Sequence, residues 1–173
     1  GEHAGKTVTA INLAISLARD VNHTVLLVDL DLRRPSVHRY LGFEPRAGLS
    51  DYLLGEAEIG DLLVNPGIER LTVRPGHRRV DHSAEMLSSP RMLNLIKELK
   101  TRYQERIVVI DMPPLLMTDD VLAFSPHVDA ALLVVEAGKT PKDEITRSIQ
   151  MLGLTNLLGT VLTKSRSGGR AYY

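Results

Sequence analysis

A glycine-containing loop at the start of the chain constrains its fold more than any other feature. The first seven residues, GEHAGKT, end in Gly-Lys-Thr and pass directly into residues 8–18, whose apolar positions recur at helical spacing. Loops of this kind bind phosphate through backbone N–H groups and the positive end of the helix dipole. The lysine reaches the outer phosphates and the threonine hydroxyl binds Mg²⁺. The pattern therefore predicts a phosphate-binding loop (P-loop) that takes ATP and Mg²⁺.

The residues expected around the phosphates belong to this loop and the first helical turn. They are Glu2, His3, Ala4, Gly5, Lys6, Thr7 and Val8. The usual pattern has four residues between its first glycine and Gly-Lys, whereas here three residues separate Gly1 from Gly5. Because a P-loop normally follows a buried strand, we expect the first strand of the fold to be missing from this chain.

Composition limits the classes of partner. A chain of 173 residues is long enough for one domain with one sizeable core. Its 21 basic and 21 acidic residues give a formal net charge of zero, which argues against nucleic acid as a partner. The absence of cysteine excludes disulfides and thiolate chemistry and fits a reducing cytoplasm.

Strand-like apolar runs alternate with helical patterns along the chain, which predicts a three-layer α/β fold with a mostly parallel, doubly wound sheet. Continuous apolar strands are typical of sheets covered by helices on both faces. The expected strands are residues 24–28, 70–73, 106–110, 130–135 and 158–162. The expected helices are residues 5–19, 90–104 and 141–153, with a short helical turn at 83–87. Residues 35–66 are expected to form an irregular excursion.

Two of the expected strands end in acidic residues. Asp29 and Asp31 follow one strand, and Asp111 follows another. In parallel sheets, ligands bind beyond the carboxyl ends of the strands, where a P-loop also lies. The pattern therefore predicts one cluster that contains these carboxylates with Lys6 and Thr7.

Two points about this cluster stay open: the division of roles between Asp29 and Asp31, and the role of Arg33. Asp111 follows the apolar run IVVI and precedes Pro-Pro, which is typical of a Walker B carboxylate that holds Mg²⁺ opposite Thr7. Of Asp29 and Asp31, one can complete the metal shell, and the other can orient a nucleophile or accept a hydroxyl proton. Arg33 either stabilises phosphate charge or only pairs with an Asp.

The motifs resemble those of the bacterial tyrosine kinases (BY-kinases), which govern exopolysaccharide and capsule synthesis. Residues 25–34, VLLVDLDLRR, resemble the Walker A′ motif of that family, and DMPP at 111–114 resembles its Walker B motif. GLSDYLLG at 48–55, SAEMLSS at 83–89 and VVEAGKT at 134–140 are similar to further family segments in the same order. The resemblance covers nearly the whole chain.

The resemblance implies roles for individual residues. Lys6 and Thr7 would bind ATP phosphate and Mg²⁺, and Asp31 and Asp111 would be the metal-side carboxylates. Asp29 would be the catalytic base that deprotonates a tyrosine hydroxyl. Relatives usually carry Asn after the last core strand, near the adenine, where this chain has Thr163-Lys164, so these two are the expected base contacts.

The resemblance also implies a domain plan and partners. Residues 1–164 would form the ATP-binding kinase domain, and residues 165–173 a flexible tail that carries Tyr172 and Tyr173. Members of the family phosphorylate such tyrosines between the subunits of a ring. The expected partners are further copies of the chain, other protein tyrosine substrates and a membrane-embedded activator (a polysaccharide co-polymerase). The expected location is cytoplasmic, at the inner face of the plasma membrane.

Two other functions remain open. The first is a positioning ATPase, similar to the septum-site and chromosome-partitioning ATPases. These carry an extra P-loop lysine at the place of Gly1, so its absence here favours the kinase. The second is a non-catalytic, nucleotide-gated assembly subunit of a polysaccharide machine.

Overall fold

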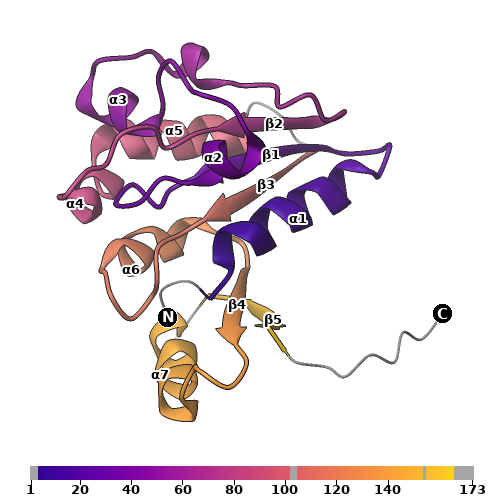
Figure 1. Cartoon of the computed structure of the whole chain (residues 1–173). Coiled ribbons are helices and arrows are strands. Elements are labelled where there is room, and N and C mark those ends of the chain that lie inside the picture. The colour runs from indigo at the N-terminus through magenta and orange to yellow at the C-terminus, as the bar shows by residue number, and fades with distance from the viewer. Residues whose placement is uncertain (1–3, 102–104, 154, 166–173) are drawn as a thin grey trace.

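Helices and strands alternate along the chain, as the sequence pattern predicts (Figure 1). The computed structural model describes residues 4–101, 105–153 and 155–165. The strands are β1 (Thr24–Asp29), β2 (Leu71–Arg74), β3 (Arg106–Asp111), β4 (Ala131–Glu136) and β5 (Leu157–Thr163). The longer helices are α1 (Lys6–Ala18), α5 (Pro90–Thr101) and α7 (Lys142–Leu152). The shorter helices are α2 (Val37–Leu41), α3 (Leu49–Leu54), α4 (Ser83–Leu87), α6 (Asp120–Phe124), η1 (Ile59–Leu62) and η2 (Ser125–His127).

All paired strands are parallel, but they form two sheets. One sheet has the order β2-β1-β3, and the other pairs β4 with β5. In the part of the chain that the structure describes, no strand joins β3 to β4 by hydrogen bonds. The register of β1 on β3 places Asp29 beside Asp111. The carboxyl ends of these two strands therefore bring the two acidic motifs together.

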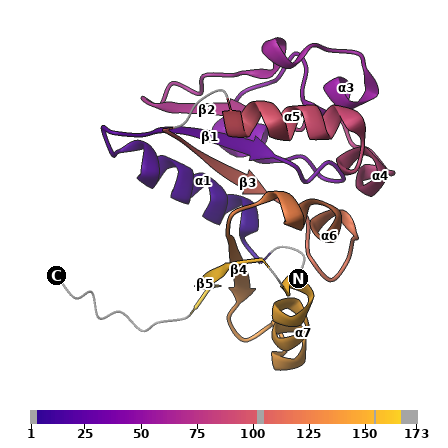
Figure 2. The same cartoon turned by 180° about the vertical axis from the view of Figure 1, so that it is seen from behind.

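Strand β1 is covered on both faces, because its successive side chains point in opposite directions. Leu26 and Val28 belong to the core cluster that includes Met92 and Leu95 of α5. Val25 and Leu27 belong to a second cluster that includes Ala10, Ile11 and Ala14 of α1. Figures 1 and 2 show α1 and α5 on opposite sides of this sheet. This arrangement confirms the expected three-layer fold and explains why β1 is apolar along its length.

The expectation of an irregular excursion at residues 35–66 was wrong in part. This stretch contains α2, α3 and η1, each too short to show a helical period in the sequence. Helix α3 is anchored because Gly48 N donates to Asp51 Oδ2 at 2.7 Å and Ser50 Oγ donates to the Gly76 carbonyl at 2.8 Å. A Cβ on Gly48 would lie 2.5 Å from the Pro75 carbonyl oxygen, so only glycine fits this contact.

Among the described residues, no helix is both long and apolar enough to cross a membrane.

Candidate active site

The P-loop lies at the carboxyl edge of the strands, at the start of α1. Gly5 has a φ of +87°, a conformation that favours glycine, and it precedes the first helical residue, Lys6. The Gly5 carbonyl accepts hydrogen bonds from Thr9 N at 2.9 Å and from Thr9 Oγ1 at 2.8 Å. Ala4 is buried, and its carbonyl accepts a hydrogen bond from Thr163 Oγ1 at 2.5 Å. The carboxyl end of β5 therefore anchors the P-loop through this hydrogen bond.

Asp29 and Asp111 form the deepest part of the site. Both side chains are almost fully buried at neighbouring strand ends. Asp29 Oδ2 accepts hydrogen bonds from the backbone N–H groups of Ser36 at 2.9 Å and Val37 at 3.0 Å, where α2 begins. Among the described residues, Asp29 Oδ1 and Asp111 Oδ2 have no hydrogen-bond partner.

Burial strongly perturbs both acids. Burial and the neighbouring Asp111 charge together raise the pKa of Asp29 to about 7, against the two backbone hydrogen bonds that lower it. Burial also raises the pKa of Asp111 to about 6, although the Thr7 hydroxyl and the Lys6 charge counteract it. Two carboxylates that destabilise each other's charge in this way favour a cation or a proton between them.

Asp31 and Arg33 lie nearer the surface than Asp29. Asp31 Oδ1 accepts a hydrogen bond from Arg34 N at 3.1 Å, and burial is the main cause that raises the pKa of Asp31. Lys6 is close enough to lower the pKa of both Asp31 and Asp111. Arg33 Nε lies 3.5 Å from Asp120 Oδ2, so Arg33 both faces the site and pairs with an acid.

A pocket of about 810 Å³ joins these groups. From the predicted site residues, its lining includes Gly5, Lys6, Thr7, Val8, Asp31, Arg33 and Lys164. Asp29, Asp111 and Thr163 are not part of this lining. Glu2, His3, Tyr172 and Tyr173 lie outside the described residues.

Comparison with known proteins decides the family. The family model described as "AAA domain" matches residues 3–152. The tyrosine-protein kinase YwqD of Bacillus subtilis is 30% identical over 171 residues, which are 98% of this chain and 71% of YwqD. The chain belongs to the bacterial tyrosine kinase family. The succinoglycan biosynthesis transport protein ExoP of Rhizobium meliloti is 34% identical over 167 residues, which are 93% of this kinase domain and 21% of ExoP.

Solved structures agree with this assignment. The kinase domain of the Escherichia coli tyrosine kinase ETK matches with a TM-score of 0.84 at 27% identity, over 99% of this kinase domain and 69% of that chain. The septum-site-determining protein MinD of Pyrococcus horikoshii, complexed with Mg-ADP, matches with a TM-score of 0.76 at 26% identity, over 97% and 69% of the two chains. The P-loop fold is therefore shared with a positioning ATPase, and the kinase domain spans about a fifth of the length of ExoP.

The kinase site fits a nucleotide with a divalent cation. Asp29 Oδ1 and Asp111 Oδ2 are buried oxygens that lack a hydrogen-bond partner among the described residues, and carboxylate oxygen is the ligand that Mg²⁺ prefers. Within the same residues, no three His, Asp or Glu side chains converge to hold a metal alone. A Mg²⁺ ion would therefore be shared between the protein and phosphate oxygens, which is its usual mode of binding.

The two residues expected at the adenine base make internal contacts. The Thr163 hydroxyl holds the P-loop through Ala4, and Lys164 Nζ lies 3.2 Å from Glu136 Oε1. Glu136 also pairs with Lys139 at 3.0 Å. Lys164 still lines the pocket, so its contact with the adenine ring remains a proposal. For Thr163, the structure supports a role in positioning the loop.

Sequence reasoning missed several residues that surround the kinase pocket. The lining also includes Arg34, Ser36, Arg39, Tyr40, Arg79, Pro113, Pro114, Met117 and Thr118. Asp120, which pairs with Arg33, was missed as well. Its one signal in the sequence is the pair Asp119-Asp120 shortly after Pro-Pro, which is too common a pattern to indicate a site.

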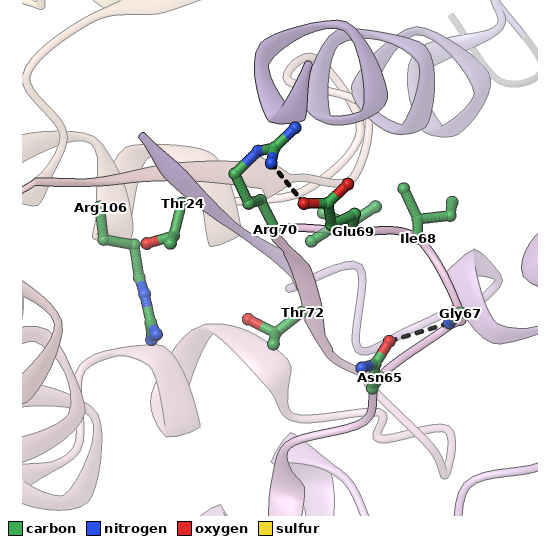
Figure 3. A pocket seen from close by; sticks show the side chains of 9 residues that line it. Thr24, Asn65, Gly67, Ile68, Glu69, Arg70, Thr72 and Arg106 are labelled. Atoms are coloured by element: carbon green, nitrogen blue, oxygen red, sulfur yellow. Dashed lines mark hydrogen bonds and ion pairs between the residues drawn. The ribbon is translucent and has the colours of Figure 1, made fainter. Parts of the chain in front are cut away.

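A second pocket, of about 450 Å³, lies at the opposite, amino-terminal end of the strands (Figure 3). Its polar side chains are partly occupied by internal contacts. Arg70 Nε donates to the Ala18 carbonyl at 2.9 Å and Arg70 Nη1 pairs with Glu69 at 2.6 Å, while Gly67 N donates to Asn65 Oδ1 at 2.9 Å. This pocket shares no lining residue with the pocket beside the P-loop.

We expect the nucleotide-free kinase domain to lose stability as the pH rises from about 5 to 8. Asp29 and Asp111 have folded-state pKa values of about 7 and about 6, above their ordinary value of 3.8, so the folded state binds more protons in this window. That stabilising contribution is lost as the pH rises through these values. Asp111→Asn removes one of the charges, so relative to the parent it should gain about 1 to 3 kcal/mol across the window.

Thermal unfolding of the parent and the Asp111→Asn variant across this pH range measures the effect. Asp143→Asn is the matched control, because Asp143 is exposed on α7 and does not line the pocket. Parallel stability curves for the parent and Asp111→Asn would contradict the raised pKa of Asp111.

Proposed function

We propose that this kinase domain belongs to an ATP-dependent protein-tyrosine autokinase that regulates exopolysaccharide or capsule biosynthesis and export. The observation that carries the proposal is the convergence of Lys6 and Thr7 with Asp29, Asp31 and Asp111 at the carboxyl ends of β1 and β3, beside one pocket. The names of the relatives YwqD and ExoP supply the substrate class and the biological setting.

The proposed reaction transfers the γ-phosphoryl group of ATP to a tyrosine hydroxyl. The phenolic oxygen bonds to the γ-phosphorus, and the bond from that phosphorus to the β–γ bridging oxygen breaks with ADP as the leaving group. Lys6 stabilises charge on the outer phosphates. Mg²⁺, held by Thr7, Asp31 and Asp111, would neutralise charge that develops between the β- and γ-phosphates.

The phenolic proton requires an acceptor. Asp29 is proposed for this role, because a pKa of about 7 suits a general base near neutral pH. Its Oδ1 atom is buried in the nucleotide-free protein, so this role requires the site to open when substrate binds. Asp31 already lines the pocket and is the competing acceptor.

We further propose that the phosphorylated residues are Tyr172 and Tyr173 of a neighbouring copy in a ring. Each phosphate adds roughly −1.5 to −2 charges beside the three carboxylates, and this repulsion would release the tail and open the ring. A membrane-embedded polysaccharide co-polymerase is the proposed activator, which would place the domain at the cytoplasmic face of the plasma membrane.

Mass spectrometry of the full-length protein, incubated with Mg·ATP with and without the membrane protein encoded at its locus, tests the function. Phosphate on Tyr172 or Tyr173 is the expected result. ATP binding without any phosphotyrosine, even with the membrane protein present, would contradict it. That outcome would favour a positioning ATPase, which the MinD likeness supports, or a nucleotide-gated assembly subunit.

A further inference from the structure

Asp120, the first residue of α6, is a fully buried acid beside the phosphate pocket. Its Oδ2 atom accepts a hydrogen bond from Ser83 Oγ, on α4, at 2.5 Å. The same oxygen lies 3.5 Å from Arg33 Nε, in the loop that follows β1. One carboxylate oxygen thus joins three segments that are far apart in the sequence.

Burying the Asp120 charge only to pack the fold would lower its stability. A buried charge destabilises a fold unless it is paired and hydrogen-bonded, and a well-packed apolar residue usually serves as well. Asp120 Oδ1 also has no hydrogen-bond partner among the described residues. The position of the cluster is informative, because Pro113, Pro114, Met117 and Thr118, which precede α6, line the same pocket as Arg33.

The Nε edge of the Arg33 guanidinium pairs with Asp120, and part of the Arg33 side chain is exposed to the pocket. Its Nε atom is buried and pairs with Asp120 Oδ2 by charge at 3.5 Å, without a hydrogen-bond partner among the described residues, whereas 41% of the side chain is exposed and it lines the pocket. A guanidinium is a planar group with five donors, so fixing its Nε edge also fixes the direction of its terminal nitrogens. Lysine, with a single flexible ammonium group, could not be oriented in this way.

We infer that Asp120 is a positioning residue, which holds Arg33 so that its terminal nitrogens face the outer phosphate of bound nucleotide, while Ser83 fixes the carboxylate. The inference rests on the proposed ATP-binding function and deepens it. Arg33 then joins Lys6 as a second cation at the phosphates. The sequence left two roles open for Arg33, stabilising phosphate charge or pairing with an acid. In this arrangement Arg33 has both roles, because its ion pair with Asp120 orients it.

The test compares affinities for a non-hydrolysable ATP analogue and for ADP, measured by calorimetry with Mg²⁺ on the full-length protein. A donor aimed at the outer phosphate favours ATP, so Arg33→Ala should lower the ATP-to-ADP affinity ratio about tenfold. Asp120→Asn, which keeps the shape but removes the charge, should lower the ratio about three- to tenfold. Asp120→Asn added to Arg33→Ala should have no further effect, because Asp120 acts through Arg33.

Asp119→Asn is the matched control, because Asp119 is exposed next to Asp120 and, among the described residues, forms no hydrogen bond or ion pair with Ser83 or Arg33. An unchanged ratio in Arg33→Ala or Asp120→Asn, or additive losses in the double variant, would overturn the inference. If Asp120→Asn does not fold, Ser83→Ala keeps the charge but frees the carboxylate, and it should lower the ratio in the same direction. A parent protein that shows the expected ratios but forms no phosphotyrosine would refute the kinase proposal and leave this inference intact.

Discussion

Replacing Lys6 by methionine is expected to lower phosphotransfer at least about a hundredfold while the protein stays folded. Methionine has a similar length but carries no charge, so the outer phosphates lose a cation where negative charge develops. Lys6 also lowers the pKa of Asp31 and Asp111 in the structure, so its loss should leave these acids more protonated and less able to hold Mg²⁺. Phosphotyrosine quantified by mass spectrometry after a timed incubation with Mg·ATP measures the effect.

Lys142→Met serves as the matched control for this experiment. Lys142 begins α7, is exposed and does not line the pocket. Circular dichroism of both variants shows whether the fold is retained. Undiminished phosphorylation in a folded Lys6→Met protein would show that Lys6 does not act in phosphotransfer. That result would contradict the proposed P-loop chemistry.

Asp111→Asn is expected to weaken Mg·ATP binding about ten- to a hundredfold, and more than Asp29→Asn does. Asp111 lies beside Thr7 and Lys6, and its buried Oδ2 has no hydrogen-bond partner among the described residues. Asp29 uses its Oδ2 to accept two N–H groups at the start of α2, which an Asn side-chain oxygen can also accept. Asp29→Asn should therefore keep most of the binding but lose transfer if Asp29 receives the phenolic proton.

Calorimetric titration of ATP with and without Mg²⁺ separates the two acids. Asp31→Asn extends the comparison, because it lines the pocket as the competing proton acceptor. Equal losses of Mg·ATP affinity in Asp29→Asn and Asp111→Asn would contradict this division of roles. Retained transfer in Asp29→Asn together with loss in Asp31→Asn would assign the proton to Asp31.

The regular elements were predictable because their signals are local. Strand β1 reads as an uninterrupted apolar run, since α1 and α5 cover both of its faces. Helices α1, α5 and α7 have 11 to 13 residues, long enough to show an apolar period. Helices α2, α3 and α6 have five or six residues, and side-chain contacts outside the helix hold them, such as the hydrogen bond from Ser50 of α3 to the distant Gly76 carbonyl.

The acidic cluster was predictable for a topological reason. Parallel strands place their carboxyl ends at one edge, so Asp29 and Asp111 had to meet near the P-loop. How deeply each acidic side chain is buried was not predictable from the sequence. Both Asp29 and Asp31 follow the same strand, but the first is buried and the second lines the pocket.

The sequence by itself determined the glycine loop before α1, the strands and the longer helices, and the acids at the ends of β1 and β3, because motif spacing and hydrophobic period are properties of neighbouring residues. Only the tertiary structure decided that Thr163 donates to the Ala4 carbonyl of the P-loop, that Asp120 pairs with Arg33 and that Ser83 donates to Asp120. Each of these contacts joins residues separated by 37 to 159 positions. Such pairings depend on where the packed elements place a side chain, and no local pattern in the sequence records them.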